Sequence, residues 1–442
     1  MVVLYLLLSV ILIILLTTKL KVHPFLALFA VALMYGFLSG MSLDNIIDSI
    51  NTGFGETLGK IGLIIIFGVI IGAFLENSGG AYRLAEAILK IVGKKRVPTA
   101  MGVIGYFISI PVFADSGFIL LSPLNKSLTK KAGITLAGST IALAMGLMAT
   151  HTLVPPTPGP IAAAGILNAD LGLVMLIGVP VSAFALIVAI IFAKKYAGKK
   201  FIDPDPKISE EEINSRMVSA PGLVKSSLPI FIPIFLIVLR SIINSIVESP
   251  NEFIRIILFL GEPVIALLIG VLLSLTLPKK LEKSMLSTSG WVGKALKDAA
   301  TIILITGAGG IFGKILQNSG IADLLGNTLA DIQMGIWLPF LLSAAIKTAQ
   351  GSSTVALITT ASIMMPMMDN LGFTTEMQKA MIVIAIGAGS AVFSHANDSY
   401  FWVVTQLSGM DVKTGYRLHS LGSAVLGISA ATFLFICYLI FV

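Results

Sequence analysis

The fold of this chain is decided by the stretch Thr150-His151-Thr152-Leu153-Val154-Pro155-Pro156-Thr157-Pro158-Gly159-Pro160. Its four prolines fall within six residues and cannot continue a helix, because each one removes a backbone donor and clashes with the preceding turn. Yet no Asp, Glu, Lys or Arg occurs between Lys131 and Asp170, and apolar residues resume at Ile161–Leu167. We therefore expect a membrane-spanning helix over about 133–168 that is broken near its middle. The alternative, an extracellular loop between two ordinary helices, is disfavoured by the lack of charge.

The composition is that of a protein that crosses a lipid bilayer several times. Of its 442 residues, 56% are hydrophobic and 12% are charged, which is about half the charge of an ordinary soluble domain. Apolar segments recur along the chain, many of them close to the length of about 20 residues that a bilayer crossing needs. The first, Val2–Leu16, lacks the basic start and the cleavage site of a signal peptide. We expect an all-α polytopic membrane protein with about ten transmembrane helices.

Cysteine content and net charge exclude several other classes of protein. The single Cys437 excludes a disulfide framework and a cysteine metal site, and we expect no metal and no other cofactor. The net charge of +7 is compatible with nucleic-acid binding. Membrane proteins, however, gather Lys and Arg in their cytoplasmic loops, so nucleic acid is not an expected partner.

Basic and acidic segments alternate along the chain. Lys and Arg cluster at 19–21, 83–96, 126–131, 194–225, 279–297 and 413–417, and the segments between these clusters carry mainly Asp and Glu. Basic loops remain in the cytoplasm. We therefore expect both termini outside the cell and the hydrophilic segment 194–225 to be a cytoplasmic linker.

Two apolar segments begin and end on the same side of this charge map. Residues 98–128 start and end among basic residues and are interrupted at Ala114-Asp115-Ser116-Gly117. Residues 335–368 start and end outside and are interrupted at Ala349-Gln350-Gly351-Ser352-Ser353-Thr354. Non-helical backbone is tolerated at membrane depth only where it is buried in protein or faces water. We expect two re-entrant hairpins.

An internal repeat relates the two halves of the chain. Gly72-Ala73-Phe74-Leu75-Glu76-Asn77-Ser78-Gly79 recurs 241 residues later as Gly313-Lys314-Ile315-Leu316-Gln317-Asn318-Ser319-Gly320. The two hairpin tips follow in the same order, and Thr150-His151 then corresponds to Ser394-His395. Three matches in one order indicate a duplication.

The charge map places the two hairpins on opposite faces, so the copies are predicted to be inverted repeats, 1–193 and 226–442. The second copy has its own break, at Ser394-His395-Ala396-Asn397-Asp398-Ser399, within a helix predicted over 376–408. Inverted repeats with broken helices are typical of secondary transporters.

The hairpin tips and the helix breaks carry polar side chains that can bind a solute. Helix N-termini at a break present a partly positive end to an anion, and hydroxyl and amide groups exchange hydrogen bonds with carboxylates and hydroxyls. We expect the substrate to be a small hydroxylated anion. The candidate binding residues are Asp115, Ser116, Thr150, His151, Thr152, Thr157, Lys347, Gln350, Ser352, Ser353, Thr354, Ser394, His395, Asn397, Asp398 and Ser399.

Proton coupling is assigned to four of these residues, Asp115, Asp398, His151 and His395. A carboxylate at membrane depth costs on the order of 3 kcal/mol or more unless it is paired or protonated, and histidine titrates near neutral pH. Each histidine is equally expected to be a neutral group that holds a break in shape. Lys347 is expected either to meet an anionic substrate or to extend to the outer surface.

These segments resemble the gluconate permease family, the gluconate:proton symporters. The resemblance rests on the proline-rich stretch followed by Ala162-Ala163-Ala164-Gly165, on Phe113-Ala114-Asp115-Ser116-Gly117-Phe118, and on the motif from Ser394 to Trp402. It implies proton-driven uptake of a sugar acid across the bacterial inner membrane by a homodimer with an elevator-like movement. It also implies a narrowed or reshaped site, because the family commonly has glycine where this chain has Tyr400.

Other functions remain open at this point. Unwound carbonyls with Asn397 and Asp398 could coordinate sodium, which would make the chain a sodium-coupled carboxylate carrier. Family members also carry related hydroxy acids, and one branch carries D-serine. An intramembrane hydrolase that uses a serine with His151 or His395 is disfavoured, because equivalent positions in two repeats suit a carrier better than one catalytic centre. We expect no enzyme, and nothing in the sequence lines the continuous pore of a channel.

Overall fold

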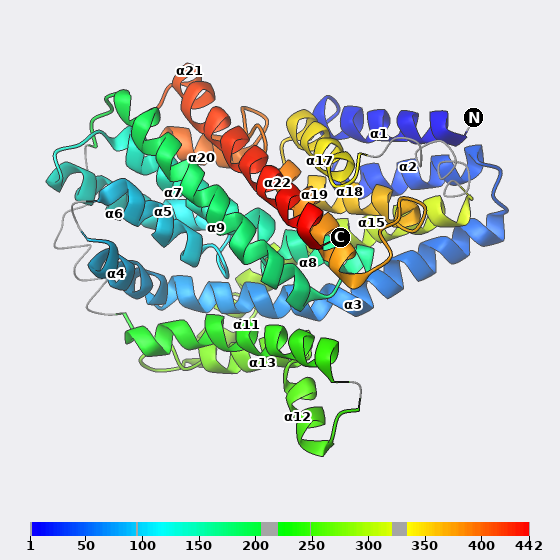
Figure 1. Ribbon diagram of the computed structural model, residues 1–442, viewed down its shortest axis with the longest axis horizontal. Coiled ribbons are helices and arrows are strands. Elements are labelled where there is room, and N and C mark those ends of the chain that lie inside the picture. The colour runs from blue at the N-terminus through cyan, green and yellow to red at the C-terminus, as the bar shows by residue number, and fades with distance from the viewer. Residues whose placement is uncertain (1, 94–95, 205–219, 248, 321–333, 442) are drawn as a thin grey trace.

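The computed structural model describes residues 2–93, 96–204, 220–247, 249–320 and 334–441, and within these ranges the chain is all helical (Figure 1). The first half contains α1 (Val2–Thr18), α2 (Pro24–Leu38), α3 (Leu43–Asn77), α4 (Gly80–Val92), α5 (Val97–Ile108), α6 (Ala114–Lys131), α7 (Leu136–Leu153), α8 (Pro158–Leu167), α9 (Leu171–Lys195) and the 3₁₀ turn η1 (Ala197–Lys199).

The second half contains a longer series of elements. These are α11 (Leu223–Ile246), α12 (Glu252–Leu260), α13 (Pro263–Ser274), α14 (Lys283–Leu286), α15 (Trp291–Asn318), α17 (Trp337–Gln350), α18 (Ser353–Met364), η2 (Met365–Met367), α19 (Glu376–Ser390), α20 (Ser399–Leu407), α21 (Val412–Gly415), the π-helical turn η3 (Tyr416–Ser420) and α22 (Leu421–Phe441).

Fewer helices than expected are long enough to cross a membrane unaided. In the described ranges six helices are long and apolar enough to cross a membrane. A seventh span is possible if α12 and α13, which are bent by 64° relative to each other, cross as one. The sequence predicts about ten spans. The difference arises because several apolar segments form helices shorter than a full crossing, among them α1, α2, α5 and α18.

Three of the four predicted interruptions overlap a gap between helices; in the first hairpin the gap lies just before the predicted position, and Ala114-Asp115-Ser116-Gly117 form the first turn of α6. α7 ends at Leu153 and α8 begins at Pro158. Proline is favoured at the first position of a helix, because an N–H there would have no acceptor within the helix. α5 and α6 are separated at 109–113, α17 and α18 at Gly351 and Ser352, and α19 and α20 at 391–398. Of the linker predicted at 194–225, residues 205–219 lie outside the described ranges, while α9 continues to Lys195.

Each hairpin packs on the broken helix of its own half and also touches that of the other half. α5 lies along α7, and α17 lies along α19. In addition α18 contacts α8, and α6 contacts α20. The four interruptions are therefore brought together in the middle of the bundle.

The repeated octapeptide has the same backbone in both places. α3 ends at Asn77 and α15 at Asn318; the next two residues in each copy are a serine and a glycine. Gly79 and Gly320 have φ of 81° and 74°, the left-handed conformation that glycine adopts without strain at helix C-termini. α3 and α15 also pack along one another.

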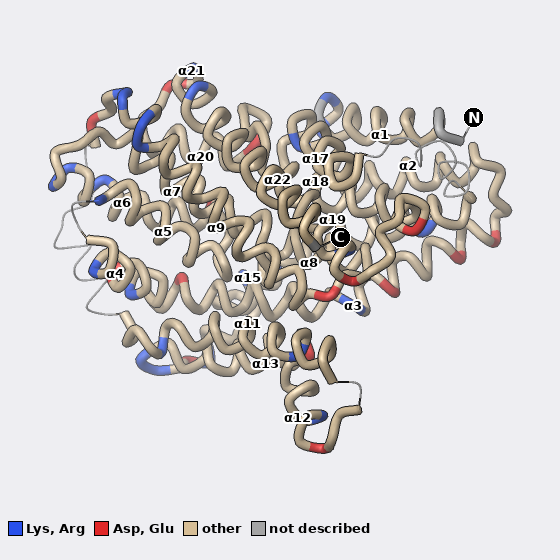
Figure 2. Tube along the Cα trace, viewed as in Figure 1, with Lys and Arg blue, Asp and Glu red and all other residues tan. Residues whose placement is uncertain are grey.

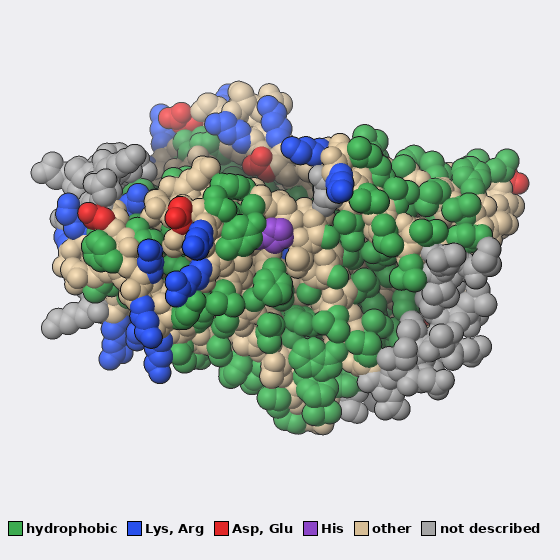
Figure 3. All heavy atoms as spheres, turned by 90° about the horizontal axis from the view of Figure 1, so that it is seen from above, with side chains coloured by type: hydrophobic (Ala, Val, Ile, Leu, Met, Phe, Trp, Pro, Cys, Tyr) green, Lys and Arg blue, Asp and Glu red, His purple; other side chains and the backbone are tan. Residues whose placement is uncertain are grey.

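Charged residues separate along the longest axis of the molecule. Figure 2 shows Lys and Arg gathered at the end that holds α4, α6 and α21, while Asp and Glu follow α3 toward its start. From above, the half of the surface away from the basic end is largely hydrophobic, as a lipid-facing surface must be (Figure 3). α11 and α13 lie side by side along one edge, with α12 projecting from them (Figure 1).

Arg240, Lys314 and Lys347, which lie within apolar stretches of the sequence, each face a carboxylate. Arg240 lies 2.6 Å from Glu262, Lys314 lies 3.9 Å from Glu56, and Lys347 lies 2.6 Å from Asp398. Of these pairs only Lys347–Asp398 is buried, with side chains 0% and 8% exposed.

Candidate functional site

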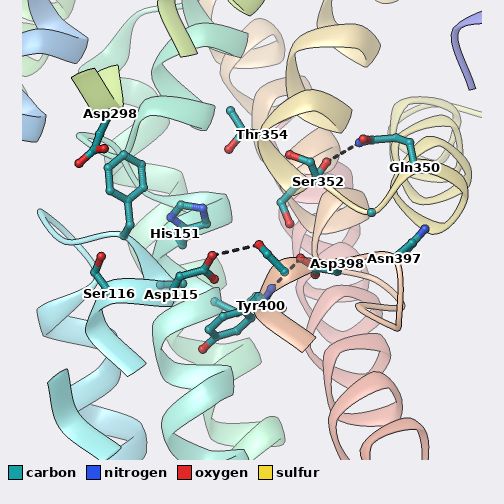
Figure 4. Close-up of a pocket in the computed structure, with 16 residues that line it drawn as sticks. Asp115, Ser116, His151, Asp298, Gln350, Ser352, Thr354, Asn397, Asp398 and Tyr400 are labelled. Atoms are coloured by element: carbon teal, nitrogen blue, oxygen red, sulfur yellow. Dashed lines mark hydrogen bonds between the residues drawn. The ribbon is translucent and has the colours of Figure 1, made fainter. Parts of the chain in front are cut away.

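A polar cavity of about 520 Å³ lies where the four interruptions meet (Figure 4). Asp115 and His151 lie on one side of it, and Ser352 and Gln350 on the other. The cavity is lined by Phe113, Ala114, Asp115, Ser116, Met148, His151, Asp298, Gln350, Gly351, Ser352, Ser353, Thr354, Asn397, Asp398, Ser399 and Tyr400. Both hairpin tips, both broken helices and α15 contribute to this wall.

Three helices begin at the cavity: α6 at Ala114, α18 at Ser353 and α20 at Ser399. The first N–H groups of a helix have no partner within it, and the helix dipole makes that end partly positive. Two of the three carry their own carboxylate, Asp115 in the first turn of α6 and Asp398 at the N-cap of α20. The start of α18 carries only hydroxyl groups.

The start of α18 is the part of the wall best suited to an anion. Ser352 Oγ accepts from the Val355 amide at 3.3 Å, and Gln350 Nε2 donates to the Ser352 carbonyl at 2.5 Å. The backbone amides of Ser353 and Thr354 have no acceptor within the described part of the chain. A carboxylate in the cavity could accept from both amides, as anions do at helix N-termini.

The carboxylate of Asp398 is already held by its neighbours. It accepts from Lys347 Nζ at 2.6 Å, from the Ser394 hydroxyl, and from the Tyr400 amide at 3.1 Å. Lys347 Nζ also donates to the Gly351 carbonyl. Lys347 therefore joins the second hairpin tip to the second break. It does not extend to the surface, and it is not among the residues that line the cavity.

Asp115 connects the two halves. Its Oδ2 accepts a hydrogen bond from Ser399 Oγ at 3.0 Å, which links the start of α6 to the start of α20. In contrast to Asp398, no described cationic side chain lies within ion-pair distance of it.

His151 lines the cavity and has one buried nitrogen without a partner among the described residues. That nitrogen is Nδ1, and the ring lies edge-on to Phe113 at 6.1 Å. Tyr400 lines the cavity with its ring, because its hydroxyl donates to the Ala144 carbonyl at 2.9 Å. An unpartnered buried nitrogen is costly unless a ligand or water pairs with it.

Most of the predicted binding residues line this one cavity. They are Asp115, Ser116, His151, Gln350, Ser352, Ser353, Thr354, Asn397, Asp398 and Ser399. The others lie behind the wall and are Thr150, Thr152, Thr157, Lys347, Ser394 and His395.

The residues behind the wall hold the breaks in shape. The hydroxyls of Thr150, Thr152 and Thr157 donate to the carbonyls of Tyr106, Met148 and Val154 at 2.9, 3.0 and 2.7 Å. His395 Nε2 lies 2.7 Å from the Thr348 carbonyl and so ties the second break to the hairpin. A polar residue next to a proline-rich break can thus be satisfied locally, which sequence alone does not distinguish from ligand binding.

Carbonyls released by the first break are closely covered by glycines. A Cβ on Gly387 of α19 would lie 2.3 Å from the Thr152 carbonyl oxygen, and a Cβ on Gly178 of α9 would lie 2.4 Å from that of Leu153. Only glycine allows two helices to approach the unwound backbone this closely.

Asp298 is the wall residue with the clearest chemistry that the sequence analysis missed. It is an exposed carboxylate in α15, directly after the basic stretch that ends at Lys297. An acid that directly follows a basic cluster and precedes the apolar segment from Ala299 was the available signal. Phe113, Ala114, Met148 and Gly351 were missed because apolar residues and glycine carry no chemical signature.

A helical bundle with six or seven helices apolar and long enough to cross a membrane, whose interrupted helices enclose a polar cavity, is typical of a membrane transporter. The fold is similar to that of the YdaH transporter of Alcanivorax borkumensis, with a TM-score of 0.64, 14% sequence identity, and coverage of 94% of this chain and 98% of that one.

The chain belongs to the GntP family of permeases, whose family model, described as GntP family permease, matches residues 1–440. It is 33% identical to the inner membrane permease YgbN of Escherichia coli, over 95% of this chain and 94% of that protein. It is 32% identical to a gluconate permease of Pseudomonas aeruginosa, over 98% and 97% of the two chains. The family resemblance is therefore confirmed, and the chain is a transporter and not an enzyme.

Proposed function

We propose that this protein carries gluconate or a closely related sugar acid into the cell together with protons. The observation that carries the proposal is the start of α18 at the cavity, where the Ser353 and Thr354 amides lack an acceptor. A sugar-acid carboxylate would accept from these amides. Its hydroxyls would exchange hydrogen bonds with Ser352, Asn397 and Ser399. The gluconate permeases among the relatives support this substrate class.

Asp115 is the proposed proton carrier. Asp398 is neutralised by Lys347, and a group that forms a buried ion pair and accepts two further hydrogen bonds has little tendency to take up a proton. Asp115 has no such cation and already faces the cavity. When protonated, Asp115 would lose its negative charge and could donate a hydrogen bond to the bound anion. Binding of the proton would therefore strengthen binding of the substrate, and the reverse.

The movement proposed is that of an elevator, in which the cavity elements cross past a fixed support within a homodimer. In the most apolar 18-residue stretch of α7 with α8, 94% is buried, which suits the centre of a moving body, whereas in that of α11 33% is buried. The support would include α11 to α13 at the edge of the bundle. The two halves would be inverted repeats, with both termini outside the bacterial inner membrane.

The test is uptake into proteoliposomes with an imposed pH gradient. Wild-type protein should accumulate radiolabelled gluconate when the interior is alkaline, and Asp115→Asn should lower gradient-driven accumulation by tenfold or more. Because Asn keeps the size and polarity of the side chain, Asp115→Asn should still exchange gluconate across the membrane without a gradient. Asp369→Asn, an exposed carboxylate away from the cavity, is the control and should accumulate normally.

The outcomes separate the parts of the proposal. Gluconate accumulation that follows a sodium gradient and ignores the pH gradient would overturn proton coupling while leaving the substrate intact. An absence of gluconate uptake under either gradient would overturn the substrate. Equal loss in Asp115→Asn and in Asp369→Asn would remove Asp115 from the coupling mechanism.

A further inference from the structure

A second polar cavity, of about 450 Å³, lies away from the site described above, between the end of α9 and the segment of α21 and η3. Four cationic side chains line it against one carboxylate. They are Lys199, Lys200, Lys413 and Arg417, and the carboxylate is Asp411. Figure 3 shows Lys and Arg side chains gathered over this end of the molecule.

Arg417 is held in a fixed orientation. Its Nε donates to the Tyr196 hydroxyl at 3.0 Å, and its guanidinium carbon lies 5.6 Å from the centre of the Tyr196 ring. Tyr196 is itself stacked on Phe192 at 5.0 Å. The two terminal nitrogens of Arg417 have no acceptor within the described ranges, so its planar donor fork remains available to a ligand.

The backbone of Lys200 is anchored by Thr135, and no acid holds the side chains of the three lysines within the described part of the chain. Thr135 Oγ1 donates to the Lys200 carbonyl at 2.7 Å, and the Ile202 amide donates to Thr135 Oγ1 at 2.9 Å. No described carboxylate lies within ion-pair distance of Lys199, Lys200 or Lys413. Two separate segments therefore bring three lysines to one cavity.

The one carboxylate in the cavity wall, Asp411, forms its hydrogen bond within its own helix. Asp411 caps α21, accepting from the Thr414 amide at 2.7 Å. The hydrogen bonds from Thr414, followed by the charges of Lys200 and Lys413, hold the pKa of Asp411 below its usual value, so the group remains ionised. The cavity therefore keeps an excess of three positive charges, counted as four cations less one carboxylate.

We propose that this cavity binds a phosphate-bearing anion. An oriented guanidinium with three lysines matches the charge and the oxygen geometry of a phosphate group, and the volume leaves room for the alcohol that the phosphate esterifies. The ligand is either a soluble phosphorylated molecule or the headgroup of an anionic phospholipid, since basic pockets beside transmembrane helices bind such headgroups. This proposal does not rest on the sugar-acid substrate.

The test uses the purified full-length protein, stripped of lipid in a neutral detergent, and follows its thermal unfolding. One arm titrates inorganic phosphate against chloride at equal ionic strength. The other titrates dioctanoyl phosphatidylglycerol against dioctanoyl phosphatidylcholine. A ligand of the folded state should raise the melting temperature with a saturating dose dependence.

The variant is Arg417→Gln combined with Lys413→Gln, and the control is Lys19→Gln combined with Lys130→Gln, two exposed lysines outside the cavity. The first should bind about tenfold or more weakly, because charge-assisted hydrogen bonds are lost, and the control should bind as wild type does. If the first variant does not fold, Lys199→Gln with Lys200→Gln replaces it.

Each result has one reading. Stabilisation by phosphate that the cavity variant loses supports a soluble phosphorylated ligand, and stabilisation by phosphatidylglycerol alone supports a lipid headgroup. The proposal is overturned if neither anion exceeds its own control. It is also overturned if the two double variants weaken binding equally.

Discussion

At the scale of single residues, the buried pair of Lys347 and Asp398 dominates the second half of the site. Both charges are withdrawn from water, and their attraction offsets that cost only because further hydrogen bonds complete the arrangement. The pair fixes the hairpin tip against the break, so the cavity wall is preformed before any ligand arrives. Lys347 is thus a positioning residue for Asp398.

We predict that Lys347→Met lowers the free energy of unfolding by about 3–5 kcal/mol, because it leaves the Asp398 carboxylate buried without its cation. The measurement is thermal or denaturant unfolding in detergent. The same change at Lys379, whose pair with Glu376 is exposed at 2.8 Å, should cost less than about 1 kcal/mol.

Combining Lys347→Met with Asp398→Asn should recover part of the loss, because removing both charges costs less than stranding one. If the loss of stability in the double variant equals the sum of the losses in Lys347→Met and Asp398→Asn, the two residues act independently and the positioning role is wrong.

The sequence predicted many of these residues but not their partners. The motifs around Asp115, Ser352 and Asp398 pointed to residues that line the cavity, because polar side chains inside an apolar segment are energetically costly and commonly mark a functional site. Sequence could not pair Lys347 with Asp398, since the two are 51 residues apart and meet only through packing of α17 on α19. For the same reason it could not assign His419, a buried residue whose Nε2 lies 3.0 Å from Ser394 Oγ.

At the scale of elements, the second hairpin tip and the second break touch backbone to backbone. Gly351 has φ of 95°, and a Cβ there would lie 2.2 Å from the Asn397 carbonyl oxygen. Asn397 in turn donates from Nδ2 to the carbonyls of Thr348 and Ala349, both at 3.0 Å. The tip therefore positions the start of α18 and the start of α20 relative to each other.

We predict that Gly351→Ala destabilises the protein and weakens gluconate binding by tenfold or more. The backbone conformation alone costs about 1–3 kcal/mol for alanine, and the new methyl group must also displace Asn397 from the cavity wall. Calorimetric binding and melting temperature are the two measurements.

Gly372→Ala is the matched control, because Gly372 has φ of 79° but nothing within 4 Å of its Cβ position. It should show the stability loss without the loss of affinity. An affinity loss of equal size in both variants would mean that Gly351 acts through overall stability and not through its contact with Asn397.

The elements were more predictable than their lengths. Proline, glycine and polar clusters mark where a helix must stop, so each of the four interruptions falls within its predicted segment. The number of full spans was not predictable, because composition does not say whether an apolar segment crosses the bilayer alone or as part of a broken pair. The π-helical turn η3, which carries both Arg417 and His419, has no sequence signature.

At the scale of the whole molecule, charge separation along the longest axis is the feature that would fix orientation in the membrane (Figure 2). The basic end holds the connections that the sequence assigns to the cytoplasm, including the proposed phosphate cavity. Basic segments resist translocation across the inner membrane. The acidic connections, such as the one between α11 and α12, would then face the exterior.

This orientation predicts opposite labelling of two matched cysteine variants. In a Cys437→Ala background, Ser249→Cys places a thiol before α12, and Ser289→Cys places one after α14; both positions are exposed and both changes replace only oxygen by sulfur. In intact cells a membrane-impermeant maleimide should label Ser249→Cys and leave Ser289→Cys unlabelled until the cells are opened. Because the bent pair of α12 and α13 is the one candidate span between these two positions in the described part of the chain, labelling of both in intact cells would contradict a crossing there. The reverse pattern would invert the molecule and place the phosphate cavity outside, where a cytoplasmic phosphorylated ligand could not reach it.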